Sequence, residues 1–544
     1  LDEVVVVGYG TMKKSDLTGA VSSVSTEKLT EKGAPSVMEN LQGSVPGVSI
    51  TQSTGRAGGS FDIEIRGKSS LNSDVKPMYV VDGVICSDIQ FLNPQDIERI
   101  DVLKDASSTA IYGSRATAGV IMVTTKSGTT EGNKVQSKPS ISYDGYYGSA
   151  VVSRMPDFMD SQEFYNYRFL KFLTYAGGNA TNGNPIYQMG SLEQCLLYNS
   201  DLNEYRLKTL LAEGNTYDWP SLVTQNGIQQ THYLAVSGSS QNVSYHMGVG
   251  YNKEDGVYKG DTQDRFNFKG SVDATINKYI SSGFSFNMAY IENEYACNSA
   301  VQYAYRMNPF MIPYDANGNL NEKPGNYVAM GSSSSYQFSD QRSPLLYMQS
   351  ETKERETYRM LGNFYIDIKP MKGMSIKSTF APNFTYYRQG DFYTSVDSPT
   401  DPNTATYESK RSLSYTWDNV LNYATKFGDI HSLNLMGLYS MTYGNQEEGF
   451  LIANGVMDGS EWYNLGSGTM NTESGDYKPS SFSESSMISY AFRANYTLMD
   501  KYMLTATVRW DGSSKFAKEN RWGSFPSVAF AWRASEEEWM KTNW

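Results

Sequence analysis

From residue 141 onward, apolar and polar side chains alternate along segments that are typical of long β-strands. In the segment 265–291 the even positions are mostly aromatic or aliphatic, and the odd positions are mostly polar or charged. The aromatic residues keep one parity on both sides of a tight turn near 277–278, namely Phe266, Phe268, Phe284 and Phe286. Because successive side chains of a strand point to opposite faces, this pattern predicts antiparallel hairpins with one apolar and one polar face.

The same alternation returns in three later segments, 358–386, 415–443 and 488–510. Each hairpin turns within a few residues, whereas the connections between hairpins, such as 292–356 and 443–485, are long and rich in Gly, Ser, Asn and Tyr. Short turns on one side and long loops on the other are typical of transmembrane β-barrels. A soluble β-sandwich also alternates, but these strands exceed the usual length of about five or six residues. The pattern therefore favours a large antiparallel barrel, with about twelve strands between residues 141 and 533.

The first part of the chain has a different pattern, in which short apolar strands alternate with short helices. Asp105 is expected to cap a helix that runs to Tyr112, and Gly113 to end it in the left-handed conformation. The Asp82-Gly83 pair predicts a tight turn between two strands. The other predicted elements are strands over 20–25, 48–52, 61–66, 97–103 and 120–125, a helix over 36–42, and a helical turn capped by Asn93. These elements predict a small α+β domain.

Three stretches of this domain resemble one family closely. They are PMYVVDGV at 77–84, NPQDIERIDVLKDASSTAIYGSRA at 93–116 and GVIMVTTKSG at 119–128. Their order is similar to that in the plug domain of TonB-dependent outer-membrane transporters of the SusC/RagA type. The chain departs from the family pattern at Thr117-Ala118 and at Ser44. The resemblance implies an all-β transmembrane barrel with an α+β plug domain in its lumen.

The resemblance also divides the chain and assigns residues. It implies a TonB box and N-terminal arm over 1–18, a plug over 19–133, and the N-terminal portion of the barrel, with long extracellular loops, over 134–544. The residues of the plug motif are Arg66, Gly67, Asp82, Gly83, Lys104, Asp105, Tyr112, Gly113 and Arg115. Among them, Gly67 is expected to form a turn and Arg66 to face the barrel wall.

The chain opens with an extended β-branched run beside acidic residues. Such a strand has unpaired backbone groups that can accept a partner strand. One interpretation is an ordinary first strand of the plug. The resemblance implies instead a TonB box, the segment on which the periplasmic energy-coupling protein TonB adds a strand. The predicted box is Asp2, Glu3, Val4, Val5, Val6, Val7 and Gly8.

Composition excludes several classes of function. The net charge of −12 argues against a nucleic-acid-binding surface, which needs clustered Lys and Arg. The chain has 41 tyrosines. A tyrosine has an apolar ring and a polar hydroxyl, so it is favoured where an apolar region meets water, as at a membrane interface. The three cysteines are widely spaced, so no disulfide framework or zinc site is expected. No apolar run reaches the length of about 18 residues that a transmembrane helix requires.

Nothing in the sequence indicates catalysis. The three histidines lack metal-ligand spacing, and no nucleophile elbow is present. We therefore expect no enzymatic activity, catalytic residue, metal site or cofactor. Aromatic loops offer stacking faces for a ligand, and Trp219, Trp462 and Tyr463 are the candidate substrate-binding residues. The alternative interpretation is that these rings anchor loop cores or the membrane interface.

Twelve strands are too few to enclose a folded plug, since barrel diameter grows with strand number. We therefore expect the chain to be the N-terminal part of a longer protein whose signal peptide has been removed. The resemblance implies import of a glycan or an oligopeptide across the outer membrane. It also implies three partners: TonB, a SusD-like surface lipoprotein that acts as a lid, and outer-membrane lipid. The alternatives are a siderophore receptor, a plugged passive pore and a secretion pore.

Overall fold

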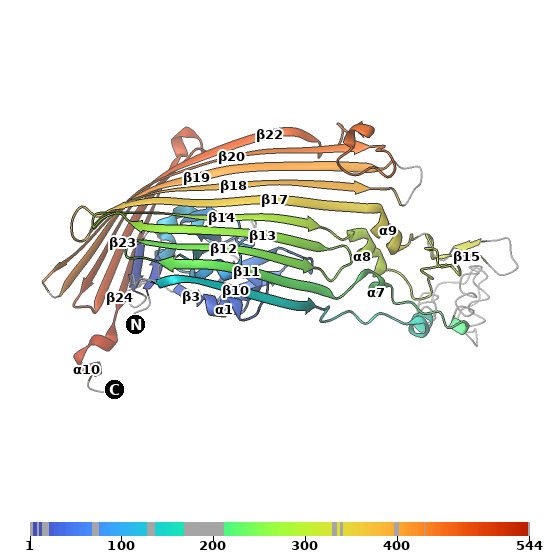
Figure 1. Ribbon diagram of the computed structural model, residues 1–544, viewed down its shortest axis with the longest axis horizontal. Helices are drawn as coiled ribbons and strands as arrows, with labels where there is room; N and C mark the ends of the chain where they lie inside the picture. Colours follow the sequence, from blue (N-terminus) through green and yellow to red (C-terminus); the bar gives the residue numbers. More distant parts are fainter. Residues whose placement is uncertain are drawn as a thin grey trace, which may run out of the picture.

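A large curved antiparallel sheet encloses a small α+β domain in the computed structural model of the chain (Figure 1). We call the large sheet the wall and the small domain, residues 21–127, the plug. The structure describes residues 4–7, 10–13, 21–67, 76–127, 137–167, 211–328, 335–337, 341–396, 402–428 and 430–541.

The wall has thirteen strands, of which twelve follow one another in sequence order and β21 lies off that path. All neighbouring strands are antiparallel. The strands are β10 (Ser137–Ala150), β11 (Gly227–Ser239), β12 (Val243–Asp255), β13 (Thr262–Thr275), β14 (Ile280–Glu294), β17 (Glu351–Ile368), β18 (Met374–Tyr393), β19 (Thr404–Phe427), β20 (His431–Asn454), β21 (Thr469–Met470), β22 (Lys478–Leu498), β23 (Tyr502–Ser513) and β24 (Trp522–Trp532). Among the described residues, no pairing joins β24 to β10. The prediction of about twelve long strands is confirmed.

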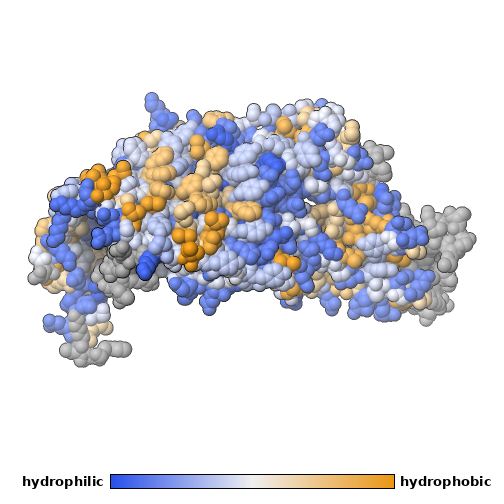
Figure 2. All heavy atoms as spheres, in the orientation of Figure 1, coloured by the Kyte–Doolittle hydropathy of each residue, from blue (hydrophilic) through white to orange (hydrophobic). Residues whose placement is uncertain are grey.

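The predicted parity of the hairpins is confirmed by side-chain exposure. Phe266 is 49% exposed and Phe284 is 42% exposed, so both rings lie on the outer face of the wall. The intervening positions point to the plug, where Arg265 is 3% exposed and Lys269 is 1% exposed. Figure 2 shows apolar side chains gathered over the middle of the strands, with hydrophilic residues on either side. This band is the surface that a transmembrane barrel presents to lipid.

The turns and connections are distributed as predicted. The turns at 240–242, 276–279, 369–373 and 499–501 are short and lie at one rim of the wall. The longer connections lie at the other rim (Figure 1). They contain α7 (Trp219–Val223), α8 (Asn298–Ala304), β15 (Asn326–Val328), β16 (Ser335–Gln337), α9 (Pro344–Ser350), η5 (Leu465–Ser467) and η6 (Lys518–Asn520). After β24 the chain continues into η7 (Ala534–Glu536) and α10 (Glu538–Lys541). No described helix is long and apolar enough to cross a membrane.

Two strands are longer than the alternation predicts. The hairpin expected over 415–443 is made by β19 and β20, which have 24 residues each. The connection to β22 is therefore shorter than the predicted 443–485. Residues 408–412 and 444–449 carry no apolar side chains on either face, so the hydrophobic period is interrupted there although the ladder continues. Cross-strand ion pairs link β19 and β20 in this polar stretch, including Arg411 with Glu447 at 3.0 Å.

The plug contains a five-stranded sheet in the order β3-β8-β9-β6-β7 and a separate β4-β5 hairpin. Its elements are β3 (Val21–Ser25), α1 (Thr26–Thr30), α2 (Val37–Leu41), β4 (Val48–Gln52), β5 (Phe61–Ile65), β6 (Met78–Val81), β7 (Val84–Cys86), η2 (Pro94–Asp96), β8 (Ile97–Leu103), α3 (Ala106–Thr109), η3 (Ala110–Ala116) and β9 (Val120–Thr125). The predicted cap is present, because the Asn93 side chain accepts a hydrogen bond from the Gln95 amide. Wall residues Ala289, Leu361 and Ala381 join the plug's hydrophobic core. The plug therefore packs directly on the inner face of the wall.

The predicted interruption of the helix at Gly113 is confirmed. An α-helical turn over Ala106–Thr109 continues as η3, and the helical backbone is broken by a kink at Gly113. Gly113 has the expected positive φ, 64°, but its ψ of −145° lies far from the left-handed helical value of about 47°.

We predict that a cation placed in the apolar band destabilises the fold. Met288→Arg puts a charge on the outer face in the middle of β14, and we expect it to lower the unfolding free energy in lipid by about 2–4 kcal/mol. Ile276→Arg, in the 276–279 turn, is the control and should cost about 0–1 kcal/mol. Reversible unfolding in lipid vesicles measures both values. Equal costs would contradict the assignment of the band.

Candidate functional site

A cavity of about 700 Å³ lies between the plug and the inner face of the wall. On the plug side it is bordered by the β4–β5 hairpin and by the segment that follows β7, with lining residues Gln52, Gly58, Phe61, Asp88 and Gln90. Helix α2 adds Glu39. Burial raises the pKa of the Glu39 carboxyl. The cavity therefore separates the plug from the rim that carries the long connections.

The wall side of the cavity is formed by strands β12 to β20 near their ends at that rim. Most of its side chains are hydroxyls, amides or cations: Asn293, Tyr295, Arg355, Thr357, Arg359, Asn383, Thr385, Tyr387, Lys410, Ser412, Ser414 and Gln446. Such groups can donate and accept many hydrogen bonds. The lining suits a polar ligand with several hydrogen-bonding groups.

One ion pair crosses the cavity from wall to plug. Arg359 on β17 lies 2.6 Å from the Asp88 carboxylate, and its guanidinium lies 4.9 Å from the centre of the Phe91 ring. Nearby, burial raises the pKa of the Cys86 thiol to about 12, so this cysteine is neutral at physiological pH. An ion pair thus connects the plug side of the cavity to the wall.

The Asp82-Gly83 turn of the plug is the first of three buried anchors. Asp82 and Gly83 have φ values of 48° and 86°, which two-residue hairpin turns of type I′ require. The Asp82 carboxylate accepts hydrogen bonds from the Thr125 amide at 2.8 Å and its hydroxyl at 2.5 Å. These bonds fix the turn to strand β9 of the plug. The predicted turn is confirmed.

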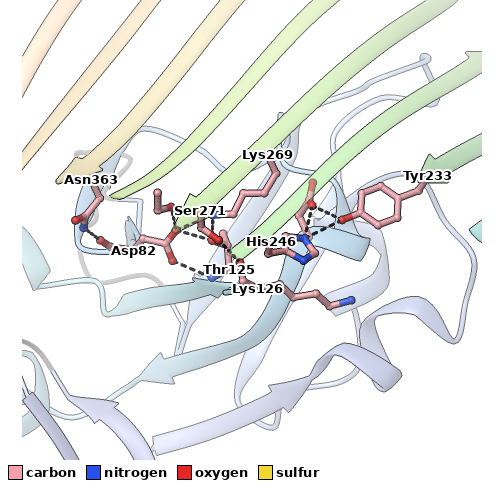
Figure 3. Close-up of polar contacts among 10 residues, drawn as sticks. Asp82, Thr125, Lys126, Tyr233, His246, Lys269, Ser271 and Asn363 are labelled. Carbon is pink, nitrogen blue, oxygen red and sulfur yellow. Dashed lines mark hydrogen bonds and ion pairs between the residues drawn. The ribbon is translucent and has the colours of Figure 1, made fainter. Parts of the chain in front are cut away.

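The same carboxylate also binds the wall. It accepts a hydrogen bond from the Ser285 hydroxyl at 2.9 Å and lies 3.4 Å from the Lys269 ammonium (Figure 3). The Asn363 amide donates to the Asp82 carbonyl oxygen. Three strands of the wall, β13, β14 and β17, therefore converge on one residue of the plug.

The charge of Asp82 is maintained by these partners. Burial alone raises the pKa of a carboxyl group, but the Lys269 ammonium and the hydrogen bonds from Thr125 and Ser285 outweigh it. The pKa of Asp82 consequently lies below its ordinary value. The anchor is an ion pair at neutral pH.

The second anchor joins η2 of the plug to strands β11 and β12. The Tyr233 hydroxyl donates a hydrogen bond of 2.5 Å to Asp96, and His246 Nε2 lies 3.3 Å from the same hydroxyl (Figure 3). His246 Nε2 is also 3.7 Å from the Asp96 carboxylate. Next to them, the Ser271 hydroxyl donates to the Lys126 carbonyl oxygen at 3.3 Å.

The third anchor explains Gly113. Arg509 on β23 is fully buried and donates to the Ile111 carbonyl oxygen, to Ser489 at 2.9 Å and to Asp511 at 2.6 Å. A Cβ on Gly113 would lie 2.1 Å from Asp511 Oδ2 and 2.8 Å from Arg509 Nε. The wall therefore approaches the plug backbone so closely here that a side chain has no room.

The other predicted plug residues serve the plug itself. Arg66 was expected to face the wall, and the partner that the structure shows for its guanidinium is Asp105 of the plug. Arg66 also has a positive φ of 58°, as has Gly67 with 89°, so the predicted turn at Gly67 is confirmed. The Lys104 ammonium donates to the Ser22 hydroxyl at 2.7 Å. These residues hold a sharp bend of the plug in place.

Two more residues of the motif lie in η3. Tyr112 is buried in the core that the plug shares with β19, β20 and β22, and its hydroxyl donates to the Met122 sulfur at 3.7 Å. Arg115 is half-buried. Tyr112 therefore supports packing between η3 and the wall.

Two of the three predicted substrate-binding rings are corrected by the structure. Trp219 is 1% exposed, lies in a loop core and donates to the Met311 carbonyl oxygen at 3.1 Å. Trp462 is 6% exposed and stacks on Tyr407, whose odd position places it on the outer face of β19. Both rings are buried in apolar clusters: that of Trp219 is formed by the long connections, and that of Trp462 includes residues of β18, β19 and β20. Tyr463 is 70% exposed and borders no described part of the cavity.

The predicted TonB box is only partly described. Residues β1 (Val4–Val7) pair antiparallel with β2 (Gly10–Lys13), so they form a hairpin instead of an open strand. Asp2, Glu3 and Gly8 lie outside the described residues. The pairing partner was not predicted, because β2 has no hydrophobic alternation.

The sequence analysis missed the wall residues of the three anchors and of the cavity. Lys269 and Arg509 occupy polar-face positions of predicted strands, whereas Arg355 lies in the predicted connection 292–356 and Tyr233 lies outside the four predicted hairpins. A charged residue at such a position was a usable signal, since it must find a partner inside the barrel. The identity of that partner depends on the position of the plug, which strand patterns do not encode.

We predict a pH-dependent effect of Asp82→Asn. Removing one partner of a buried ion pair should lower the unfolding free energy by about 3–5 kcal/mol at neutral pH. Because the folded pKa of Asp82 lies below the model-peptide value of 3.8, its stabilisation is complete above that value and is lost as pH falls through the lower, folded pKa. Thermal unfolding at several pH values tests this. Asp62→Asn, at an exposed plug carboxylate, should stay within about 0.5 kcal/mol.

We also predict that Gly113→Ala is more damaging than Gly43→Ala. Both glycines have positive φ, but a Cβ on Gly43 meets nothing within 4 Å. The variants therefore share a backbone cost, and Gly113→Ala adds an overpacking cost of about 1–3 kcal/mol. Chemical unfolding gives the difference, and limited proteolysis shows whether the plug loosens. Equal stability of the two variants would rule out the close approach.

The comparisons with known proteins agree with this arrangement. Residues 13–120 match the family described as the TonB-dependent Receptor Plug Domain. TonB-dependent receptor P26 of Formosa agariphila is 32% identical over 99% of this chain and 51% of its own length. TonB-dependent receptor SusC of Bacteroides thetaiotaomicron is 28% identical over 99% of this chain and 52% of its own length. The chain spans about half the length of the curated relatives it matches.

Solved structures show the same fold. The RagAB peptide importer in its open-open state aligns with a TM-score of 0.76 at 23% identity, over 97% of this chain and 58% of that one. The ferric preacinetobactin receptor BauA of Acinetobacter baumannii aligns with a TM-score of 0.56 at 12% identity, over 98% of this chain and 64% of its own. The chain therefore belongs to the TonB-dependent receptors of the SusC/RagA type, of which it carries the plug domain and part of the transmembrane β-barrel.

Proposed function

We propose that this protein imports a polar oligomer, an oligosaccharide or an oligopeptide, across the outer membrane. The observation that carries the proposal is the cavity between plug and wall, whose lining is rich in hydroxyls, amides and cations. A plug held in the lumen blocks free diffusion, so a ligand in this cavity passes only if the plug moves. The ligand leaves chemically unchanged, and no cofactor takes part.

Energy for that movement comes from the periplasmic partner TonB in this proposal. The hairpin of β1 and β2 precedes the plug, and the described backbone of β1 offers a second strand edge for augmentation. The rim with the short turns faces the periplasm, and the rim with the long connections faces outward, as in transmembrane barrels. The cavity then opens toward the outside.

The same orientation assigns the long connections to a surface partner. We propose that a SusD-like lipoprotein covers the outward rim and closes the cavity once a ligand has entered. One structural neighbour is the RagAB peptide importer, and one relative is the receptor SusC. The likeness to BauA, a ferric preacinetobactin receptor, extends to the fold alone. A siderophore is therefore the less favoured ligand.

We predict that deleting Val4–Val7 in the full-length protein abolishes energised uptake and leaves ligand binding intact. Uptake of radiolabelled oligosaccharides and oligopeptides by whole cells should fall at least tenfold, while binding to purified protein should change less than twofold. The amount of protein in the outer membrane must be equal in both strains. Undiminished uptake by the deletion strain would refute dependence on TonB. Growth limited by iron, and not by oligomers, would favour the siderophore alternative.

A further inference from the structure

Four cations line the cavity, and three of them are already neutralised or bound. Arg359 pairs with Asp88 at 2.6 Å, and Lys410 lies 3.7 Å from Glu448. The third, Arg265, is 3% exposed and donates to two carbonyl oxygens of the plug at 2.6 Å each. The contacts of Arg359 and Arg265 join the wall to the plug, whereas Lys410 pairs within the wall. The fourth cation, Arg355, is different.

Arg355 has no carboxylate partner among the described residues. Its Nε and Nη2 atoms both donate to Gln389 Oε1, at 3.0 Å and 2.6 Å. The amide of Gln389 in turn donates to Asp391 at 3.1 Å, and that carboxylate lies 3.0 Å from the Lys353 ammonium. The neighbouring acid is therefore neutralised by another cation, and Arg355 keeps its full charge.

The contact with Gln389 leaves one edge of the guanidinium open. Gln389 occupies the side formed by Nε and Nη2, and within the described chain Nη1 donates to no acceptor. The end formed by Nη1 and Nη2 carries two parallel N–H groups, the geometry that a carboxylate matches with both oxygens. Arg355 is half-buried and lines the cavity, so this edge is within reach of a ligand there.

Two aromatic rings hold the guanidinium in position. Its central carbon lies 5.6 Å from the centre of the Tyr295 ring and 5.1 Å from that of Tyr387. Both distances fall within the range of about 6 Å for cation–π contact. On the plug side, the guanidinium of Arg56 lies 5.8 Å from the same Tyr295 ring. Arg355 is thus pre-oriented before any ligand arrives, which lowers the entropy cost of binding.

The acids of the cavity do not compete for this edge. Asp88 is paired with Arg359, and Glu254 accepts hydrogen bonds from the Gly58 amide at 3.1 Å and from Gln229 at 3.5 Å. The remaining one, Glu39, belongs to helix α2 on the plug side. A ligand would therefore place its negative group on the wall and its uncharged part toward the plug.

We propose that Arg355 is a specificity-determining residue that binds a carboxylate of the imported oligomer. The proposal rests on the proposed function and narrows it to anionic oligomers, such as uronic-acid oligosaccharides or peptides with a free carboxyl terminus. Both sources offer the same planar anion. A purely structural role for Arg355, as a spacer between Tyr295 and Tyr387, predicts no preference for charge.

The test measures binding of matched acidic and neutral probes to the purified full-length protein by calorimetry. One pair is tetragalacturonate and its methyl ester, and the other is N-acetyl-tetra-alanine with a free or an amidated carboxyl terminus. We expect the wild-type protein to bind the acid of at least one pair about tenfold more tightly than its neutral partner. The pair that shows the preference identifies the source of the carboxylate.

Variants separate charge recognition from packing. Arg355→Gln should reduce the preference to less than twofold, without weakening binding of the neutral probe by more than twofold. Arg355→Lys keeps the charge but not the paired N–H groups, so it should retain part of the preference. Lys478→Gln, at a wall cation that does not line the cavity and lies 3.7 Å from Glu448, should leave the preference unchanged.

Three outcomes overturn the proposal: no preference for either acid in the wild type, an unchanged preference in Arg355→Gln, or no binding of any acid. Energised uptake of neutral oligomers without preference for acids would defeat this inference alone. Uptake that survives deletion of Val4–Val7 would instead defeat the proposed function, and the effect of Arg355 on binding would stand.

Discussion

The requirement that a buried charge must have a partner determines how the plug sits in the wall. Lys269 is 1% exposed and Arg509 is fully buried, although both project from strands that otherwise alternate between lipid and lumen. An isolated charge in such surroundings is costly by several kcal/mol. Lys269 therefore needs the plug in one position, where Asp82 supplies its charged partner. Arg509 is paired with Asp511 on its own strand, and the plug adds the Ile111 carbonyl oxygen as a further acceptor. Moving the plug breaks its contacts with both residues together.

Because the anchors are polar, a movement of the plug that breaks them is reversible. The anchors consist of hydrogen bonds and ion pairs, and water can replace these partners once the interface opens. Hydrophobic contacts also join plug and wall. Ala289, Leu361 and Ala381 share one core with the plug, and Val420, Met436, Leu438 and Ala491 share a second one. The plug has a five-stranded sheet of its own. A polar interface around a separately folded domain is consistent with a gate that opens and closes many times.

The sequence predicted the fold more completely than the site. Alternation identified the strands and their outer faces because burial against lipid and lumen imposes a period of two. It failed in β19 and β20 where residues 408–412 and 444–449 carry no apolar side chain on either face. It also did not identify Asp105, distant in sequence, as the partner of Arg66, and it misjudged Trp462, which packs on the outside of the wall. Each failure concerns a contact set by tertiary position and not by local pattern.

The length of β19 and β20 has a consequence for the shape of the entrance. At about 3.3 Å per residue and a tilt of about 40°, a strand of 24 residues rises roughly 60 Å along the barrel axis. The hydrocarbon core of a bilayer is only about 30 Å thick. On this side, the wall therefore extends well beyond the lipid headgroups at the rim with the long connections. A cargo captured at that rim would descend through a long aqueous vestibule before reaching the plug.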